Sequence, residues 1–287
     1  MHFVQAKSIL SAQNGMNIYR GCSHGCIYCD SRSKCYGFTH EFEDIEVKEN
    51  APALLEQALK SRRRPCMIAT GSMSDPYQPL ELQLGLTRRC LALIERYGFG
   101  ATVLTKSTRV LRDLDLLKAI NQKTKAVVQM TLTTYDEALC RIVEPRVETT
   151  AERARALRVL RDEGIPTVVW LTPMLPFIND TEENVRGLME LCAGAGVRGV
   201  IHFGMGLTLR EGDREYFYAA LDRHFPGLKA KYIERYGMAY ELPSPNYRAL
   251  RKIVHEACAA HGMMEGPDEC FRYLSELPEK YEQTSLF

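Results

Sequence analysis

Three cysteines near the N-terminus have the spacing of ligands to an iron–sulfur cluster. Cys22, Cys26 and Cys29 lie in one short segment, and Gly21 and Gly25 allow the chain to fold tightly there. A cluster of four irons needs one soft ligand for each iron, and a closed electron-transfer site supplies four thiolates. Three thiolates leave one iron open to a ligand from outside the protein. The segment therefore predicts a metal site that can take part in chemistry.

A zinc site is the alternative for the same residues. His24 lies between the first two cysteines and would complete a Cys3His set of ligands. However, His24 is held inside so tight a loop that the convergence of all four groups on one ion is awkward. No fourth ligand follows at the spacing of a zinc finger. We therefore favour the iron–sulfur cluster.

The composition is that of a globular domain without a strong overall charge. The chain has 287 residues, of which 45% are hydrophobic, and its 37 basic and 36 acidic residues give a net charge of +1. A nucleic acid or a membrane would therefore need a local patch to bind to. We expect a cytoplasmic protein, because the N-terminus lacks a signal-peptide pattern and no apolar run approaches the ~20 residues of a membrane span. The ten cysteines are mostly scattered singly, which indicates reduced thiols.

Apolar runs of strand length alternate with helical periodicity over residues 14–204, which is typical of parallel strands joined by helices. We predict an α/β fold, a partial (β/α)6 TIM-like barrel, because no matching seventh or eighth unit follows. The barrel is assigned to residues 1–205, and a helical C-terminal region with a terminal tail to residues 206–287. The predicted strands are 16–20, 66–70, 101–105, 126–132, 167–171 and 199–203, and the predicted helices are 51–60, 84–97, 110–120, 150–163 and 181–193.

The loops that follow the strands of such a barrel carry its functional groups, whereas the opposite face mainly contributes stability. The cysteine segment and several polar loops rich in Gly and Pro fall on the functional face. The basic run 62–64 falls on the other face, where a solvated charge run is the simpler interpretation. We assign that run no function.

The motif Cys-x3-Cys-x2-Cys, with Tyr28 before its last cysteine, resembles that of the radical SAM superfamily. The resemblance implies that Cys22, Cys26 and Cys29 bind a [4Fe-4S] cluster and that S-adenosylmethionine (SAM) chelates the fourth iron. It also implies an enzyme that cleaves SAM to a 5'-deoxyadenosyl radical, which abstracts a hydrogen atom from a substrate. A one-electron reductant such as flavodoxin or ferredoxin would then be a partner.

The same resemblance implies a set of residues that contact SAM. Tyr28 would pack near the adenine, the backbone at Gly71 would receive the amino group, and Lys106 would pair with the carboxylate. A hydroxyl of Thr131 or Thr133 would bond the ribose. Small polar residues commonly end strands, so a structural role is the alternative for each. The complete predicted set is Tyr28, Gly71, Ser72, Ser74, Lys106, Thr131 and Thr133.

More narrowly, the sequence looks like the spore photoproduct lyase-like branch. The likeness rests on residues 17–29, on Ser74-Asp75 and Thr105-Lys106, and on residues 176–180. In the lyase, a cysteine three residues before that aspartate returns a hydrogen atom to the product radical, and this chain has Ser72 there. A tyrosine follows the last cluster cysteine in the lyase, and this chain has Asp30. We therefore predict a relative with a different reaction or substrate.

The catalytic residues beyond the cluster are unknown from the sequence. Cys35 and Cys140 are candidates for a hydrogen-atom donor because both are expected near the functional face. Asp75 and Tyr77, in the loop after the second predicted strand, are further candidates. A lone cysteine is more often a small buried hydrophobic residue, and that is the alternative for both thiols.

Two further segments bear on the partners. Residues 210–240 interleave aromatic and basic side chains, which would suit nucleic acid, but the acidic residues among them nearly cancel the charge. An amphipathic helical cap that buries its tyrosines explains the same pattern, and we favour it. The terminal residues Gln283, Leu286 and Phe287 are similar to the peptide that docks repair proteins on the DNA sliding clamp, although Thr284 departs from it. A tail folded back on its own domain is the alternative.

These hints lead to two hypotheses of different classes. The first is a radical SAM enzyme, with nucleic acid as a possible substrate. The second is a nucleic-acid or clamp-binding module in which the metal site is structural.

Overall fold

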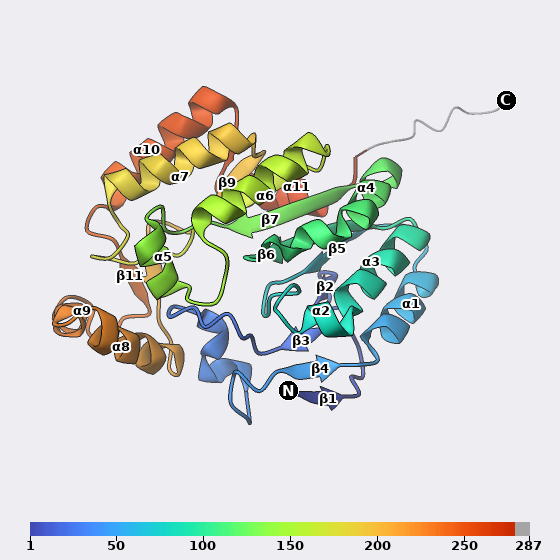
Figure 1. The fold of residues 1–287 in the computed structure, drawn as a ribbon, viewed down its shortest axis with the longest axis horizontal. Coiled ribbons are helices and arrows are strands. Elements are labelled where there is room, and N and C mark those ends of the chain that lie inside the picture. The colour runs from blue at the N-terminus through green and yellow to red at the C-terminus, as the bar shows by residue number, and fades with distance from the viewer. Residues whose placement is uncertain (279–287) are drawn as a thin grey trace.

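The computed structural model describes residues 1–278 and contains a seven-stranded parallel sheet (Figure 1). All neighbouring strands in it are parallel, and from β2 to β12 their spatial order follows the chain. Such a sheet forms when a helical connection returns the chain to the same edge after each strand. The predicted α/β partial barrel is confirmed. In spatial order the strands are β12 (Met264–Glu265), β9 (Gly199–Ile201), β8 (Thr167–Trp170), β7 (Ala126–Thr131), β6 (Gly100–Thr105), β5 (Met67–Thr70) and β2 (Gly15–Met16).

Helices cover the outer face of the sheet (Figure 1). Their apolar sides pack on the strands in one large core, and the central strand β7 is buried along its whole length. Burial on both faces explains why this strand is a nearly continuous apolar run. Side-chain caps start several helices, most completely at Thr149 and Glu152, which form a capping box. These helices are α1 (Ala51–Ser61), α2 (Glu81–Leu84), α3 (Leu86–Arg96), α4 (Leu114–Lys123), α6 (Thr150–Asp162), α7 (Glu182–Ala195) and α10 (Tyr247–His261). Helix α5 (Glu137–Val143) lies outside this layer, and its Val143 belongs to the same apolar cluster as Ile27 and Tyr28.

The last helix, α11 (Pro267–Ser275), packs against the inner face of the sheet. Cys270 and Leu274 of this helix form a cluster with buried residues of four strands, among them Val127 of β7. The next residue, Val128, belongs instead to the outer core, because successive side chains of a strand point to opposite faces. The C-terminal helix therefore fills part of the barrel interior.

Two small sheets and two helices complete the fold. The first sheet contains β1 (His2–Val4), β4 (Glu46–Lys48) and β3 (Tyr19–Arg20), and the second is a pair of antiparallel strands, β10 (Gly206–Thr208) and β11 (Glu241–Pro243). Helices α8 (Asp213–His224) and α9 (Leu228–Tyr236) pack with Ile27 and Tyr28 in a separate apolar cluster. The cysteine segment is thereby enclosed between the barrel and these two helices. Three 3-10 helices are η1 (Asp30–Arg32), η2 (Lys34–Tyr36) and η3 (Thr108–Asp113).

The structure differs from the predicted elements at three places. The predicted strand 16–20 is divided, because Met16 pairs with β5 whereas Tyr19 and Arg20 pair with β4. The predicted helix 110–120 begins as η3 and becomes α4 only at Leu114. Helix α10 and strand β12 add a seventh unit to the six predicted units. Strand β12 has only two residues, so the sequence contained no apolar run of strand length to indicate it.

The C-terminal region contributes to the barrel as well as to its cap. Strand β12 and helix α11 lie beyond residue 206 and pack on the main sheet. The division of the chain into residues 1–205 and 206–287 stays a prediction. Among the helices of residues 1–278, none combines the length and apolar character needed to cross a membrane.

Candidate active site

A cavity of about 360 Å³ lies at the carboxyl ends of the barrel strands, and all three cysteines of the predicted cluster site line it. Cys22 and Cys26 are buried, and all three thiols are free of disulfide bonds. Beyond the cysteine loop, the rest of the lining comes from the ends of β6, β7 and β8, from the loops after β5, β6, β8 and β9, from β10 (Gly206–Thr208) and from segment 30–36. The functional face predicted from the barrel pattern is thus the face that carries this cavity.

The cysteine loop is tightly wound, as its glycines indicated. Gly21 has φ +90°, and a side chain there would place its Cβ 2.4 Å from the carbonyl oxygen of Phe42. Burial raises the pKa of the Cys22 thiol to about 12 and the pKa of the Cys26 thiol well above its usual range. Buried thiols of this kind give up their protons when a cation binds them. Three soft donors on one cavity fit an iron–sulfur cluster with one open iron.

Gly71 and Lys106 border the cavity on two neighbouring strands. A Cβ at Gly71, where φ is +100°, would lie 1.9 Å from the carbonyl oxygen of Leu104, so only glycine fits against β6 here. The Nζ of Lys106 lies 5.7 Å from the ring centroid of Tyr28. Burial lowers the pKa of this lysine, but Cys26 and the Glu144 carboxylate more than offset that effect and raise it. Within residues 1–278 no carboxylate lies within ion-pair distance of this amine. The Lys106 ammonium group can therefore pair with an anionic group of a ligand in the cavity.

Asp75 ties the cysteine loop to two strand ends. Its carboxylate accepts hydrogen bonds from the Thr105 hydroxyl and the Lys106 backbone N–H, each 2.7 Å long, and from the Tyr77 N–H at 2.8 Å. His24 Nδ1 lies 3.5 Å from the same carboxylate, and burial lowers the pKa of this imidazole. His24 lines the cavity, and its buried Nε2 has no hydrogen-bond partner in the described chain. Asp75 therefore positions other groups, and His24 is placed to meet a ligand of the cavity.

A buried ionic network holds Tyr28 of the cysteine loop in place. The sequence did not indicate this network. Glu144 accepts hydrogen bonds from the Tyr28 hydroxyl and from the Arg153 guanidinium, and both charged groups are fully buried. Arg153 also donates a 2.7 Å bond to the carbonyl oxygen of Thr131 at the end of β7. The network thus joins Tyr28 to a strand end that lines the cavity. In the sequence, Glu144 and Arg153 are only two opposite charges in a region of helical periodicity. Such pairs are too common for the sequence to indicate this one.

The structure brings most of the predicted SAM-contacting residues to this cavity. Ser72, Ser74 and Thr131 line it together with Tyr28, Gly71 and Lys106. Thr133 does not line it, because this side chain is fully buried and lies 3.5 Å from Glu144. The roles of all these residues in SAM binding stay predictions.

Three of the four catalytic candidates lie outside the cavity lining, whereas Asp75 lies within it. Tyr77 is fully buried and donates a 2.9 Å hydrogen bond to Asp113. Cys140 is also buried, with its Sγ 3.2 Å from Arg153. Cys35 is exposed and lies 3.3 Å from Arg210. Cys35 lies in η2 and Cys140 in α5, and the side to which a helix turns a single cysteine cannot be read from the sequence.

Asp30, which stands where the lyase pattern has a tyrosine, lies at the cavity rim beside Tyr36. The Tyr36 hydroxyl donates a 2.7 Å hydrogen bond to Asp30, and both residues line the cavity. Burial and this carboxylate raise the pKa of Tyr36 to about 12. Arg210 lies 3.7 Å from Asp30 and 3.5 Å from the Tyr36 hydroxyl. A phenol, a carboxylate and a guanidinium thus meet beside Cys29.

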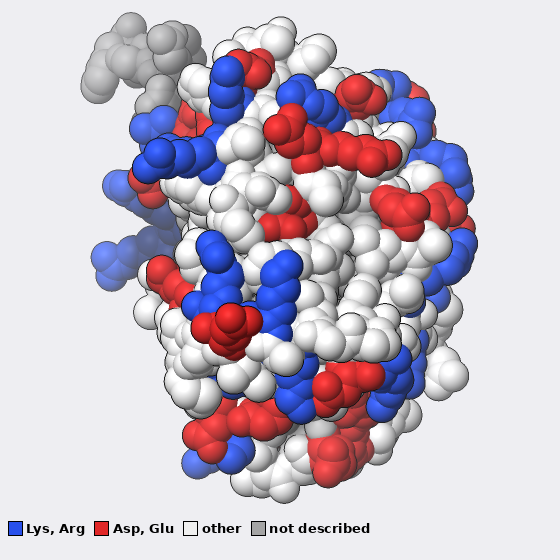
Figure 2. All heavy atoms as spheres, turned by 90° about the vertical axis from the view of Figure 1, so that its left-hand side faces the viewer, with Lys and Arg blue, Asp and Glu red and all other residues white. Residues whose placement is uncertain are grey.

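The segment 210–240 forms the predicted helical cap. Phe217 and Tyr232 are fully buried, and the Tyr232 hydroxyl donates a 2.6 Å bond to the carbonyl oxygen of Pro176. Figure 2 shows the side of the molecule with α8 and α9, where Lys and Arg side chains alternate with Asp and Glu. Lys229, for example, lies 2.7 Å from Asp222. Phe217 and Tyr232 are therefore core residues, whereas Tyr216, Tyr218 and Tyr236 are half-buried, and the surface of these helices is of mixed charge.

We expect replacement of Asp213 by asparagine to change how stability depends on pH. The buried Asp213 accepts the Arg210 N–H, but its Oδ2 has no partner among the described residues. Burial, and the nearby charge of Asp30, raise the pKa of Asp213 to about 7. Since an unfolded aspartate titrates near pH 3.9, the folded state binds the extra proton, and stability falls as the pH rises from about 4 to 7.

An asparagine side chain would remove this loss without removing the acceptor oxygen. The Asp213→Asn variant should gain about 2 kcal/mol relative to the wild type between pH 5 and pH 7.5, measured by thermal unfolding. Asp222→Asn, on the exposed side of the same helix, is the matched control. Parallel pH profiles of wild type and Asp213→Asn would contradict the assignment.

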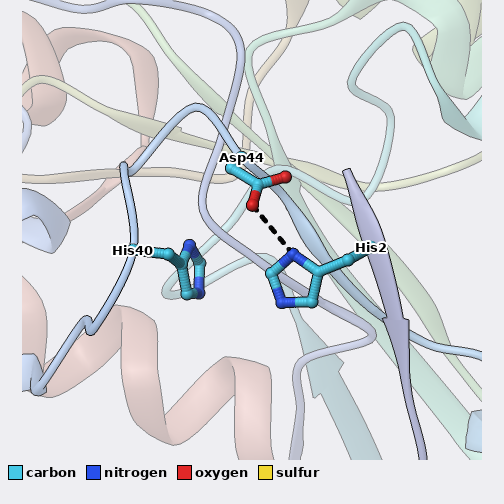
Figure 3. Close-up of side chains that lie close together, drawn as sticks. All are labelled: His2, His40 and Asp44. Atoms are coloured by element: carbon cyan, nitrogen blue, oxygen red, sulfur yellow. Dashed lines mark hydrogen bonds and ion pairs between the residues drawn. The ribbon is translucent and has the colours of Figure 1, made fainter.

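A second group of possible metal ligands lies apart from the cavity. His2, His40 and Asp44 each place one ligand atom within 4.8 Å of the others (Figure 3). His2 Nδ1 is already 3.0 Å from Asp44, and these two side chains are 40% and 44% exposed. The group joins β1 to the segment that leads into β4. We interpret it as a surface contact between these two segments.

The sequence model of the radical SAM superfamily matches residues 16–192, which include the cysteine loop and strands β3 to β8. The chain belongs to the radical SAM superfamily. Members of this superfamily are enzymes that use a [4Fe-4S] cluster and SAM. The cluster and the cofactor predicted from the cysteine motif are thereby confirmed for this radical SAM protein.

The relatives by sequence do not indicate a substrate. A protein of uncharacterised function from Mycobacterium tuberculosis is 34% identical over 247 residues, which are 82% of this chain and 70% of the relative. Another, from Methanocaldococcus jannaschii, is 32% identical over 181 residues, 62% of this chain and 67% of the relative.

Solved structures of spore photoproduct lyase share the fold. One lyase mutant gives a TM-score of 0.65 at 15% identity and covers 91% of this chain and 78% of that one. A second, with bound SAM and a dinucleoside spore photoproduct, gives 0.62 at 14% identity, covering 87% and 74%. At this identity the likeness shows the fold alone.

Proposed function

We propose that this radical SAM enzyme binds its cluster through Cys22, Cys26 and Cys29 and abstracts a hydrogen atom from a nucleic-acid substrate. The observation that carries the proposal is the convergence of all three thiols, Lys106 and the Gly71 backbone on one cavity. A structural metal site would not need a neighbouring cation and a glycine cradle at two other strand ends. The enzyme hypothesis is therefore better supported than the binding-module hypothesis.

Different residues of the cavity are placed to bind different groups of SAM. The Lys106 amine is placed to pair with a carboxylate, and the backbone at Gly71 allows a ligand to approach β6 without a side chain in the way. Tyr28 offers an apolar ring that Glu144 holds in place. Thr131 and Ser74 supply hydroxyl groups. These contacts orient the cofactor and exclude water from the reacting atoms.

When bound, the reduced cluster supplies one electron that cleaves SAM to methionine and a 5'-deoxyadenosyl radical, which takes a hydrogen atom from the substrate. The electron must come from a one-electron reductant, and we propose flavodoxin or ferredoxin for this role. The cavity contains Ser72 where the lyase has its hydrogen-donating cysteine, and a serine O–H is a poor hydrogen-atom donor. We therefore propose a reaction other than that of the lyase.

Anaerobic reconstitution tests the proposal. The protein should take up about four irons and, with dithionite, convert SAM to 5'-deoxyadenosine. With deuterated nucleic acids as candidate substrates, deuterium should appear in the 5'-deoxyadenosine. Stoichiometric zinc in place of iron, with no cleavage of SAM, would contradict the proposal.

Docking on the DNA sliding clamp is a separate prediction. Gln283, Leu286 and Phe287 lie outside the described residues, so this prediction rests on the sequence alone. Two large apolar side chains in a terminal peptide are suited to a partner's pocket. Deletion of Leu286 and Phe287 should abolish binding to purified sliding clamp in a pull-down or by calorimetry. The truncated protein should still bind iron, and equal clamp binding by both forms would refute the idea.

A further inference from the structure

A second cavity adjoins the cysteine cavity at Phe203. This outer cavity has a volume of about 490 Å³ and lies between the end of β9, the β10–β11 pair and the start of α10. The two cavities share Thr172, Pro173, Phe203, Leu207 and Thr208. The two cavities are therefore adjacent, so a molecule in the outer cavity would lie next to the site proposed for SAM.

Phe203 is exposed but held in place. Its side chain is 56% exposed, and its ring centroid lies 5.7 Å from that of Trp170 and 6.1 Å from that of Phe271. Trp170 donates a 2.7 Å hydrogen bond to Gln129, and Gln129 donates a 2.8 Å bond to Thr102. This relay across three strands fixes the indole on which Phe203 rests. The ring is therefore preorganised, which reduces the entropic cost of binding a ligand to it.

The exposed rings favour a planar, apolar-faced ligand. Leaving Phe203 in water is unfavourable by about 25 cal/mol for each Å² of apolar surface, and a ligand that covers the ring recovers this free energy. Tyr240, which is 44% exposed, and Tyr247 line the same outer cavity. Aromatic rings stack on nucleobases regardless of sequence, because every base has a π face.

Two arginines at these tyrosines add the charge that a nucleotide requires. Arg210 donates a 2.9 Å hydrogen bond to the Tyr240 hydroxyl, and Arg251 donates a 3.1 Å bond to the Tyr247 hydroxyl. Arg210 is partly neutralised by Asp30, whereas Arg251 forms no ion pair with any residue of the described chain. Glu241 also lines the cavity, so phosphate would be held on the Arg251 side. Stacking rings beside cations are typical of sites for single-stranded nucleic acid.

We infer that the outer cavity is the substrate subsite and that it takes a nucleobase of single-stranded nucleic acid, stacked on Phe203, with an adjoining phosphate near Arg251. The inference rests on the proposed function, which requires a substrate beside SAM. It adds the place where the substrate binds and the residues that recognise it.

Binding of two octanucleotides to the reconstituted holoenzyme with SAM tests this inference. One probe is a mixed-sequence DNA strand, and the other is an abasic strand of equal length and charge, both measured anaerobically by fluorescence anisotropy. The wild type should bind the base-containing strand more tightly. Phe203→Leu should weaken that binding about ten- to hundredfold and leave the abasic strand's affinity within twofold. Phe3→Leu makes the same change at a 50% exposed phenylalanine of β1 that lines neither cavity, and is the matched control.

A second variant and the affinity for SAM complete the test. Arg251→Gln should weaken both strands and reduce the salt dependence of their binding. Equal affinity of the wild type for both strands would overturn the inference while leaving the cleavage of SAM, and hence the radical chemistry, intact. The affinity for SAM is measured by equilibrium dialysis. If Phe203→Leu weakens the binding of SAM by as much as the binding of the base-containing strand, the ring contacts the cofactor and the inference is wrong. Failure of the wild type to form 5'-deoxyadenosine would overturn the proposed function itself.

Discussion

Replacement of Cys26 by alanine should abolish cluster binding and reduce the cleavage of SAM by at least about a thousandfold. Cys26 is buried and lines the cavity, and in the sequence it is the middle one of the three cysteines. No water molecule or other side chain can replace it as a soft ligand. Without three thiolates the open iron and its cofactor site are lost together. The measurements are iron content, the visible absorption of the cluster and the amount of 5'-deoxyadenosine formed under dithionite.

Cys192→Ala is the matched control for this experiment. Cys192 is as buried as Cys26, but it lies in α7 within the outer core and lines neither cavity. The control should lose some stability and keep the cluster. Turnover of SAM by the Cys26→Ala protein at a rate near that of the wild type would refute the assignment of the ligands.

Replacement of Arg153 by methionine should strongly destabilise the protein. It would leave the Glu144 carboxylate buried without its cationic partner and the Thr131 carbonyl oxygen without its donor. Breaking a buried pair from one side costs about 3–5 kcal/mol, because the remaining charge loses its compensation. The thermal midpoint of the anaerobic protein should fall by roughly 10 °C.

The double variant separates the charge from the loss of packing. Glu144→Gln combined with Arg153→Met removes both charges and should recover part of the stability that Arg153→Met loses. Because Glu144 also holds the Tyr28 hydroxyl, the double variant should still bind SAM more weakly than the wild type. The free energy of unfolding lost by Glu144→Gln alone gives the comparison. If the double variant loses the sum of the two single losses, Glu144 and Arg153 do not act as a pair.

The chemistry at the cavity rim gives a physical reason to expect a reaction different from that of the lyase. Ser72 is exposed at the cavity and offers no weak S–H bond to a substrate radical. The Tyr36 hydroxyl is hydrogen bonded to Asp30 next to the last cysteine. Both positions that depart from the lyase pattern, Ser72 and Asp30, thus line the cavity. Specificity in this chain is therefore expected to lie at this rim and in the outer cavity.

The sequence by itself determined the features that depend on neighbours along the chain. The cluster ligands could be predicted because Cys22, Cys26 and Cys29 fall in one loop, where their spacing already implies that they converge. The parallel sheet could be predicted because each strand is a local apolar run between helical segments. The length of those runs also explains the error, since the two-residue strand β12 is too short to have a pattern.

Only the tertiary structure decided which distant side chains meet. Thr131 ends β7 and lines the cavity, whereas Thr133 lies in the loop after the strand and is buried beside Glu144. The pairing of Glu144 with Arg153, and of Trp170 with Phe203, likewise depends on how helices and strands are docked. Such contacts arise from register and packing over long separations in the chain. The cysteine loop therefore identified the cofactor chemistry, whereas the fold formed the outer cavity in which we propose the substrate binds.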